Sequence, residues 1–382
     1  MELKLIGILG LTALSGYYLL VILFFHRGFG RLRPAPGQPP QPFSIVIAAR
    51  NEEARISRCL NSVLLQDYPG DQYEVIVVND RSTDNTRAVV EAILPRKKNL
   101  KLINVAECPE GVSPKKNALA QGIREATGEI ILFTDADCIV PRTWVRTVNG
   151  HFTPDIAAVA GLTTYFRPAS MPPLFWGLQA MDFFSHSVVS AAAMGAGLPI
   201  NTNANNFAVR KELFHRLEGF RKVADIVSGD DDLILQALTK GGGAKAEYAP
   251  EKGAAVETEP TLTLKGVWEQ RKRWSSKTVY YNRKQALVLS GVFIYYLSIL
   301  TGILLSPFKP QIFPWVAGAF LFKTALDFTL AFRGMRMFGK TNLLRYFLPL
   351  AFLHIPFIVF ACFFGIFGKF AWKDGYVKKR LG

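Results

Sequence analysis

The chain has 382 residues, of which 49% are hydrophobic and 20% are charged. It is too apolar for one ordinary soluble domain and too charged for a pure bundle of membrane helices, so we expect a soluble domain joined to membrane segments. The formal net charge is +15. It has no Lys/Arg block long enough for a nucleic-acid-binding tail, and its basic residues gather beside apolar runs, which favours anionic lipid headgroups as partners.

The chain opens with an uncharged apolar segment, residues 5–25. Such a length is enough to cross about 30 Å of hydrocarbon. Arg27, Arg31 and Arg33 follow it, without the small-residue site that a cleaved signal peptide would have. We therefore expect a retained anchor over residues 1–26. The positive-inside rule then keeps the next domain in the cytoplasm.

A proline-rich stretch, residues 27–42, is expected to form an extended linker to a soluble region. That region opens with alternating strand and helix patterns. The predicted strands are 43–49, 73–79, 100–105 and 129–135, and the helical patterns between them are 52–66, 82–94 and 113–126. Ser82 or Thr83 should cap the second helix, and Ser113 with Pro114 the third. This alternation predicts an α/β fold with a mostly parallel sheet.

Three aspartates are expected at one edge of this sheet, because ligands bind beyond the carboxyl ends of parallel strands. Asp80 follows the second strand, where it can accept hydrogen bonds from a base or ribose. Asp135 ends the fourth strand and Asp137 follows it, and their carboxylates suit a hard cation such as Mg²⁺ or Mn²⁺. A solvated acidic turn is the alternative. Lys115, in the first turn of a helix with Lys116, would be favoured by a bound phosphate.

Two further polar patterns lie later in the soluble region. Asp230 to Asp232 precede an amphipathic helix, where adjacent carboxylates raise one another's proton affinity and suit one of them to act as a general base. Helix capping is the alternative for the others. Gln270, Arg273 and Trp274 lie on a basic helix just before the membrane, for which snorkelling side chains are the alternative explanation.

The remaining apolar runs predict how the chain meets the membrane. Residues 174–198 are long enough to span, but Asp182 and His186 favour a segment lying at the membrane surface. Candidate spans follow at 286–308, 312–332 and 346–368. Lys323 and Asp327 are four residues apart and can pair on one helix face. Pro349 and Pro356 leave open whether the last segment is re-entrant.

The four cysteines lack the spacing of a zinc site or a disulfide framework, so reduced thiols are expected.

Taken in order, the motifs resemble those of the membrane-bound family 2 glycosyltransferases, the group of ceramide glucosyltransferase and of hyaluronan and cellulose synthases. The resemblance covers roughly residues 40–285. "AARNEE", "NDRSTD", "SPKKNAL", "DAD", "GDDDL" and "QRKRW" stand where the family carries its motifs. Departures are Ala48 for proline, Asn79 and Arg81 in the second motif, and Gly229 before the aspartates.

The resemblance implies a GT-A fold and an inverting transfer of sugar from a nucleotide-diphosphate donor, a UDP-sugar being expected. It assigns the cation to Asp135 and Asp137 and the general base to Asp230. Arg50, Glu52, Asp80 and Lys115 would hold the nucleotide sugar. Gln270, Arg273 and Trp274 would close over the diphosphate and acceptor.

The domain plan that results has a cytoplasmic GT-A domain at 43–260 and an interfacial helix at 261–285. About three transmembrane helices follow over 286–370, and a basic tail over 371–382. Transfer to a lipid in the inner cell membrane, by a multi-pass protein, is the favoured function, because four spans are few for a polysaccharide channel. A processive polysaccharide synthase, a non-catalytic scaffold and a small transporter built around Lys323 and Asp327 are the alternatives. The sequence leaves the sugar and the acceptor lipid open.

Overall fold

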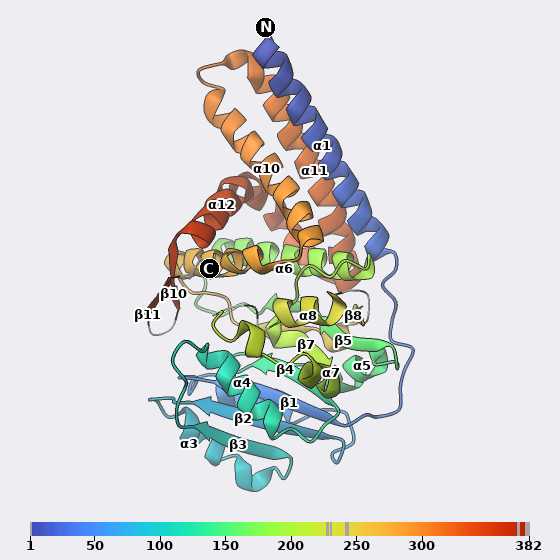
Figure 1. Cartoon of the computed structure of the whole chain (residues 1–382), viewed down its shortest axis with the longest axis vertical. Coiled ribbons are helices and arrows are strands. Elements are labelled where there is room, and N and C mark those ends of the chain that lie inside the picture. Colours follow the sequence, from blue (N-terminus) through green and yellow to red (C-terminus); the bar gives the residue numbers. More distant parts are fainter. Residues whose placement is uncertain (1, 227–228, 230, 241–243, 373–374, 379–382) are drawn as a thin grey trace. The chain divides into compact units, whose positions relative to one another are not determined.

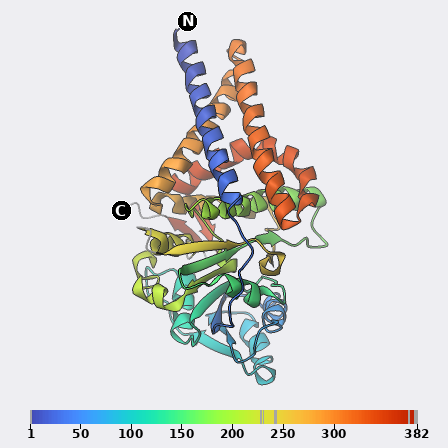
Figure 2. The same ribbon diagram turned by 90° about the vertical axis from the view of Figure 1, so that its right-hand side faces the viewer.

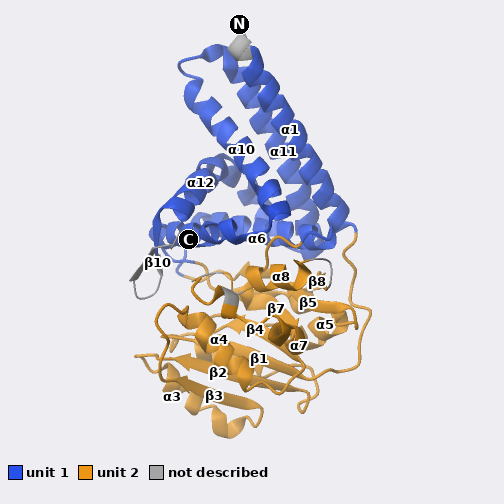
Figure 3. Ribbon diagram, in the orientation of Figure 1, with its two compact units in different colours: residues 1–30, 170–198, 261–382 blue, residues 31–169, 199–260 orange. Residues whose placement is uncertain are grey.

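The computed structural model describes residues 2–226, 229, 231–240, 244–372 and 375–378. Its chain divides into two compact units, coloured separately in Figure 3. The helical unit comprises residues 1–30, 170–198 and 261–382, and the sheet unit comprises residues 31–169 and 199–260. Each unit has its own packing and is described by itself.

The sheet unit is built on a mixed sheet with the strand order β3-β2-β1-β4-β7-β5-β8 (Figure 1). Strands β3, β2, β1 and β4 are parallel, β7 is antiparallel to both of its neighbours, and β8 is parallel to β5. Strands β6 and β9 form a separate parallel pair. The bounds are β1 Phe43–Ala49, β2 Tyr73–Asp80, β3 Leu100–Val105, β4 Ile130–Asp135, β5 Ile156–Gly161, β6 Thr163–Tyr165, β7 Phe207–Arg210, β8 Lys245–Ala249 and β9 Val256–Thr258.

Helices cover both faces of the parallel strands because successive side chains of a strand point to opposite faces. Val46 and Val78 face α4, where Gly122 leaves no room for a Cβ. Ile45 and Val77 face the other way and belong to the hydrophobic core that α2 and α5 complete. The helical segments are α2 Ile56–Val63, α3 Thr86–Glu91, α4 Pro114–Arg124, α5 Trp144–His151, α7 Lys211–Arg216 and α8 Asp232–Thr239, with 3-10 turns η1 Leu94–Arg96, η2 Ala204–Asn206, η3 Arg221–Val223 and η5 Lys252–Ala254.

The four predicted strands are confirmed to within one residue at each end, and the three predicted helices are present in shorter form. Ser113 is the N-cap residue of α4 and Pro114 its first residue, as expected. The cap predicted for α3 is wrong, since Asn85 occupies that position. Ser82 and Thr83 instead hydrogen-bond to Asn51 in the neighbouring loop, with distances of 3.0 and 2.8 Å.

The proline-rich linker predicted at 27–42 starts later, because residues 27–29 belong to α1; residues 32–42 have no regular secondary structure and are held against the sheet unit. Asn149 donates hydrogen bonds to the carbonyls of Gln38 and Pro39 at 3.1 and 3.0 Å. The Ala35 amide donates to Glu251 at 2.6 Å. Residues 31–42 therefore form part of the sheet unit rather than a free tether.

The helical unit contains four helices that are long and apolar enough to cross a membrane, counted over the described residues. They include the N-terminal segment and the three C-terminal segments expected from sequence. The last of them, α12, runs without a break through Pro356. The bounds are α1 Glu2–Phe29, α6 Pro173–Gly195, α9 Leu264–Ser276, α10 Arg283–Leu305, α11 Phe313–Phe338 and α12 Phe347–Phe367, with turns η6 Lys277–Tyr280, η7 Pro310–Ile312 and η8 Thr341–Tyr346, and a hairpin of β10 Lys369–Trp372 and β11 Gly375–Lys378.

Helix α6 is not among those four helices. It runs across the ends of α1 and α11 rather than alongside them (Figure 1, Figure 2). A Cβ at Gly28 of α1 would fall 1.9 Å from the Ala192 carbonyl oxygen of α6, so the two backbones touch. The expected continuous catalytic domain at 43–260 is therefore interrupted, because residues 170–198 group with the membrane helices.

Candidate active site

The carboxyl edge of the parallel strands gathers most of the candidate residues of the sheet unit. Asp135 ends β4 and is in register with Ala48 of β1, while Ala49 is in register with Asn79 of β2. Arg50 directly follows β1 and Asp80 ends β2. The strand register thus brings three of the predicted positions to one edge.

Two loops at this edge are tied together by backbone and side-chain hydrogen bonds. The Glu52 amide donates to the Thr86 hydroxyl at 2.8 Å, and the Asn85 amide donates to the Glu53 carboxylate at 2.8 Å. Asn51 and Arg81 both have a positive φ, at 55° and 53°, which lets each loop turn sharply away from its strand. This pairing fixes the backbone on both sides of the site.

Asp80 is buried between two arginines. The Arg81 Nε donates to its Oδ1 at 2.9 Å, and Arg50 Nη1 lies 3.9 Å from its Oδ2. Arg81 is one of the two residues, with Asn79, that depart from the second family motif. The Arg81 guanidinium therefore contacts the Asp80 carboxylate, which the sequence analysis assigned to binding the nucleoside.

The adjacent lysines of α4 have separate partners. Lys115 Nζ lies 2.8 Å from Asp135 Oδ1. A residue predicted to bind the nucleotide sugar therefore contacts a residue predicted to bind the cation. Lys116 is buried and donates to the carbonyls of Val223 and Ile226 at 2.7 Å each. From the sequence, a bound phosphate was expected to offset the positive charges of both lysines at the start of the helix. The structure shows that these two carbonyls already bind the Lys116 ammonium.

Asp137 is a carboxylate with two other carboxylates nearby. Burial, followed by repulsion from Asp135 and Glu52, raises the pKa of its carboxyl to about 6. Oxygen ligands with excess negative charge suit a hard divalent cation. Within the described residues, no three His, Cys, Asp or Glu side chains group closely enough to enclose a metal alone. The residues therefore fit an open site that shares its cation with a ligand.

The start of α8 separates the three consecutive aspartates. Asp231 is the N-cap residue, and its carboxylate accepts from the Asp232 amide at 2.7 Å. Asp232 is fully buried and accepts from the Thr202 amide at 2.7 Å. The capping role is thus confirmed for Asp231, whereas Asp232 holds the Thr202 amide instead. Asp230, the proposed base, lies outside the described residues.

The last three candidate residues lie on α9, in the helical unit. Gln270, Arg273 and Trp274 are half-buried there. Trp274 packs against Phe183 and His186 of α6, with ring centroids 5.6 and 5.7 Å apart. The structure thus divides the candidates between an edge of the sheet unit and one helix of the other unit.

Comparison with known proteins identifies the family. Residues 130–366 match the family described as Glycosyl transferase family group 2, and residues 44–212 match Glycosyl transferase family 2. The first match covers more than half of the chain. The chain belongs to the family 2 glycosyltransferases.

Curated relatives agree with this assignment. A beta-monoglucosyldiacylglycerol synthase of Synechocystis is 26% identical over 60% of this chain and 46% of that protein. YdaM of Bacillus subtilis, a probable glycosyltransferase, is 26% identical over 85% of this chain and 82% of its own. This family 2 glycosyltransferase spans about half the length of the first curated relatives that it matches.

The mannosyltransferase PcManGT of Pyrobaculum calidifontis, solved with GDP-Man and Mn²⁺, superposes with a TM-score of 0.59. It is 22% identical and covers 94% of this chain and 97% of its own. The shared fold confirms the GT-A architecture expected for this family 2 glycosyltransferase.

Two interactions of this family 2 glycosyltransferase were not predicted. Arg271 of α9 is buried, donates to Asp182 of α6 and lies 4.0 Å from the Trp274 ring centroid. An aspartate within an apolar helix was the available signal, because such a charge requires a partner. Arg55 forms ion pairs with Glu52, at 3.3 Å, and with Glu259. Glu259 is far from Arg55 in sequence, so no local sequence pattern predicts this contact.

Proposed function

We propose that this chain transfers a sugar, with inversion, from a nucleotide-diphosphate donor to a hydroxyl group of a membrane lipid. The observation that carries the proposal is the gathering of Arg50, Asp80, Lys115 and Asp135 at the carboxyl edge of the sheet. The named activity of the diacylglycerol-glucosylating relatives supports a lipid acceptor, and a UDP-sugar is the expected donor.

Each candidate residue has a chemical role in this reaction. Asp135 and Asp137 would hold Mg²⁺ or Mn²⁺, which when bound neutralises charge on the leaving diphosphate. Arg50, Glu52 and Asp80 bind the nucleoside, and Lys115 binds phosphate or base. Gln270, Arg273 and Trp274 contact the diphosphate and the acceptor.

The transfer itself needs one base. Asp230 accepts the proton of the acceptor hydroxyl as its oxygen bonds to the anomeric carbon. The bond from that carbon to the diphosphate oxygen breaks with the electron pair on the leaving group. Attack from the face opposite the leaving group inverts the configuration.

The protein is proposed to be a multi-pass protein of the inner cell membrane, with the sheet unit in the cytoplasm. The four apolar helices support membrane association. Arg27, Arg31 and Arg33, which follow the first helix, support a cytoplasmic position for the segment after them.

The experiment uses the full chain in lipid nanodiscs containing diacylglycerol, with a panel of UDP- and GDP-sugars. Mass spectrometry detects the glycolipid, and its size distribution separates single transfer from processive synthesis. Asp137→Asn should lower transfer by about 10²-fold or more, since a bound cation contributes several kcal/mol to charge stabilisation. Asp155→Asn is the matched control, because Asp155 is exposed and pairs with Lys245. Full transfer in chelator, or by Asp137→Asn, contradicts the cation role.

A further inference from the structure

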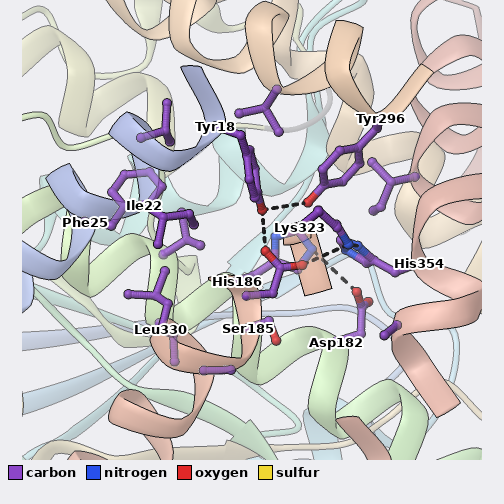
Figure 4. A pocket seen from close by; sticks show the side chains of 18 of the residues that line it. Tyr18, Ile22, Phe25, Asp182, Ser185, His186, Tyr296, Lys323, Leu330 and His354 are labelled. Atoms are coloured by element: carbon purple, nitrogen blue, oxygen red, sulfur yellow. Dashed lines mark hydrogen bonds and ion pairs between the residues drawn. The ribbon is translucent and has the colours of Figure 1, made fainter. Parts of the chain in front are cut away.

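A cavity of about 250 Å³ lies within the helical unit. Its walls come from α1, α6, α10, α11 and α12, so all five elements belong to one compact unit. Most of the wall is aliphatic or aromatic, including Ile22, Phe25 and Leu330 (Figure 4). The polar side chains gather in one region of it, and they are Tyr18, Asp182, Ser185, His186, Tyr296, Lys323, Asp327 and His354.

The charged groups of the cavity are already neutralised in pairs. Lys323 Nζ lies 2.8 Å from Asp327 Oδ2, and the Tyr18 hydroxyl donates to Asp327 Oδ1. The ammonium also lies 3.5 Å from His354 Nδ1 and 4.7 Å from the centroid of the Tyr296 ring. A phosphate group entering this cavity would therefore meet no excess positive charge, and its desolvation would go uncompensated.

One buried acceptor of the cavity lacks a donor. Asp182 is 4% exposed, and its Oδ2 accepts from Arg271. Its Oδ1 has no hydrogen-bond partner among the residues described, and His186 Nε2 is 4.0 Å away. Arg271 nevertheless keeps the carboxyl ionised, since burial alone would raise the pKa of Asp182 but this neighbour lowers it. A buried carboxylate oxygen of this kind calls for a hydroxyl or N–H donor.

We infer that this cavity binds a neutral, hydroxyl-bearing lipid, whose hydroxyl donates to Asp182 Oδ1 while its first chain carbons pack on the apolar wall. The volume suits a small headgroup and the beginning of the chains. The pairing of every charge selects against a lipid phosphate. The inference rests on the proposed function only in naming this lipid as the acceptor; the binding site itself does not depend on it.

The test measures lipid binding by the full chain without any nucleotide sugar. Diacylglycerol carrying a photoreactive group on one acyl chain is incubated with the protein in nanodiscs, and labelled peptides are mapped by mass spectrometry. Val292→Trp and Leu289→Trp fill the cavity from α10. Ile294→Trp is the matched control, because Ile294 is 49% exposed on the same helix. Asp182→Asn tests the acceptor but also removes the partner of Arg271, so the filling variants carry the test.

Both filling variants should reduce labelling of α6, α10 and α11 peptides by at least about tenfold, while Ile294→Trp changes it less than about twofold. Unlabelled diacylglycerol should compete, and a polyprenyl phosphate should not. Undiminished labelling in both filling variants, or equal competition by the phosphate lipid, overturns the inference. Hydrolysis of the nucleotide sugar without lipid is measured separately, because it depends on the sheet unit. Normal hydrolysis with undiminished labelling in the filling variants would contradict this site alone, whereas absent hydrolysis with the expected loss of labelling would contradict the proposed function alone.

Discussion

Lys115 and Lys116 are neighbours in sequence and differ in surroundings. Lys115 is partly exposed and contacts Asp135 at the sheet edge. Lys116 is buried, and its ammonium holds the carbonyls of Val223 and Ile226. Those carbonyls belong to the segment that leads to the aspartates before α8. Lys115 therefore stays the lysine that we propose to contact a ligand, whereas Lys116 holds two backbone carbonyls.

Substituting each lysine with methionine should separate these roles. Lys115→Met should weaken nucleotide-sugar binding and leave the melting temperature nearly unchanged. Lys116→Met should lower stability by about 1–3 kcal/mol, because it leaves buried carbonyls without donors. Isothermal titration with donor and a thermal melt, run on both variants, check this. Equal losses of stability would contradict the assignment.

His151 is a buried histidine whose two ring nitrogens both face carboxylates. Nδ1 lies 3.0 Å from Glu247 and Nε2 lies 3.0 Å from Glu251. Burial alone would lower the pKa of His151, but the hydrogen bonds to Glu247 and Glu251 outweigh it and raise the pKa to about 9. Since Glu251 also accepts from Ala35, the charged ring lies beside the attachment of the proline-rich stretch.

The stability of the sheet unit should depend on this proton. A histidine pKa raised above its ordinary value of about 6.5 adds stability that is complete below pH 6.5 and disappears as the pH rises through about 9, with a size of roughly 1–3 kcal/mol. The melting temperature of the wild type should therefore fall more between pH 6 and pH 9.5 than the melting temperature of His151→Gln. Parallel pH profiles of the two proteins would contradict the raised pKa.

At the scale of single elements, the start of α8 combines a structural and a proposed catalytic position. Asp231 caps the helix and Asp232 anchors the Thr202 amide, so each has a structural task. Asp230 lies outside the described residues and stays the proposed base. The structural roles of Asp231 and Asp232 are in keeping with that proposal.

Asp230→Asn should leave donor binding and the melting temperature intact while lowering transfer by about 10²–10⁴-fold. Asp231→Asn should keep most activity and cost about 1 kcal/mol or less, because asparagine is also a good N-cap residue. Transfer rates and melts of both variants decide between them. A well-folded, inactive Asp231→Asn beside an active Asp230→Asn would show that the base is misnamed.

Prediction from sequence succeeded where local signals are strong. Strands β1, β2 and β4 are largely apolar and buried along nearly their whole length, so their ends were clear. Helix starts were less predictable. Ser82 and Thr83 are residue types that commonly cap helices, but here they form hydrogen bonds with Asn51 in the neighbouring loop. The pair of Asp182 and Arg271 was beyond reach, because 89 positions separate its members and only the packing of α6 against α9 joins them.

At the scale of the whole molecule, neither unit is a continuous stretch of chain. The chain passes from one unit to the other after residues 30, 169, 198 and 260. Helix α6 is inserted between parts of the sheet unit, yet its buried side chains, such as Phe184 and Val188, belong to the helical unit. A fragment cut at the ends of the soluble region therefore carries a helix without its partners.

Two fragments test this division. Residues 31–260 taken directly should aggregate, because α6 exposes apolar surface once α1, α11 and α12 are removed. Residues 31–169 joined to 199–260 through a flexible linker should be soluble and monomeric, with a cooperative melt. Size-exclusion chromatography and circular dichroism compare them. Equal solubility of the two fragments would mean that α6 does not depend on the membrane helices.

The interrupted order of the units has a consequence for biosynthesis. About 150 residues separate the end of α6 from the start of α12, so at roughly 5–20 residues per second the helix waits on the order of ten seconds for this partner. Until α9 and α11 have also been made, the nascent chain carries an apolar helix that, among its described partner helices, only α1 can cover. If insertion of the C-terminal helices is delayed, we therefore expect quality-control proteases to degrade the nascent chain. The defect would appear as a lower amount of protein rather than as a less active enzyme.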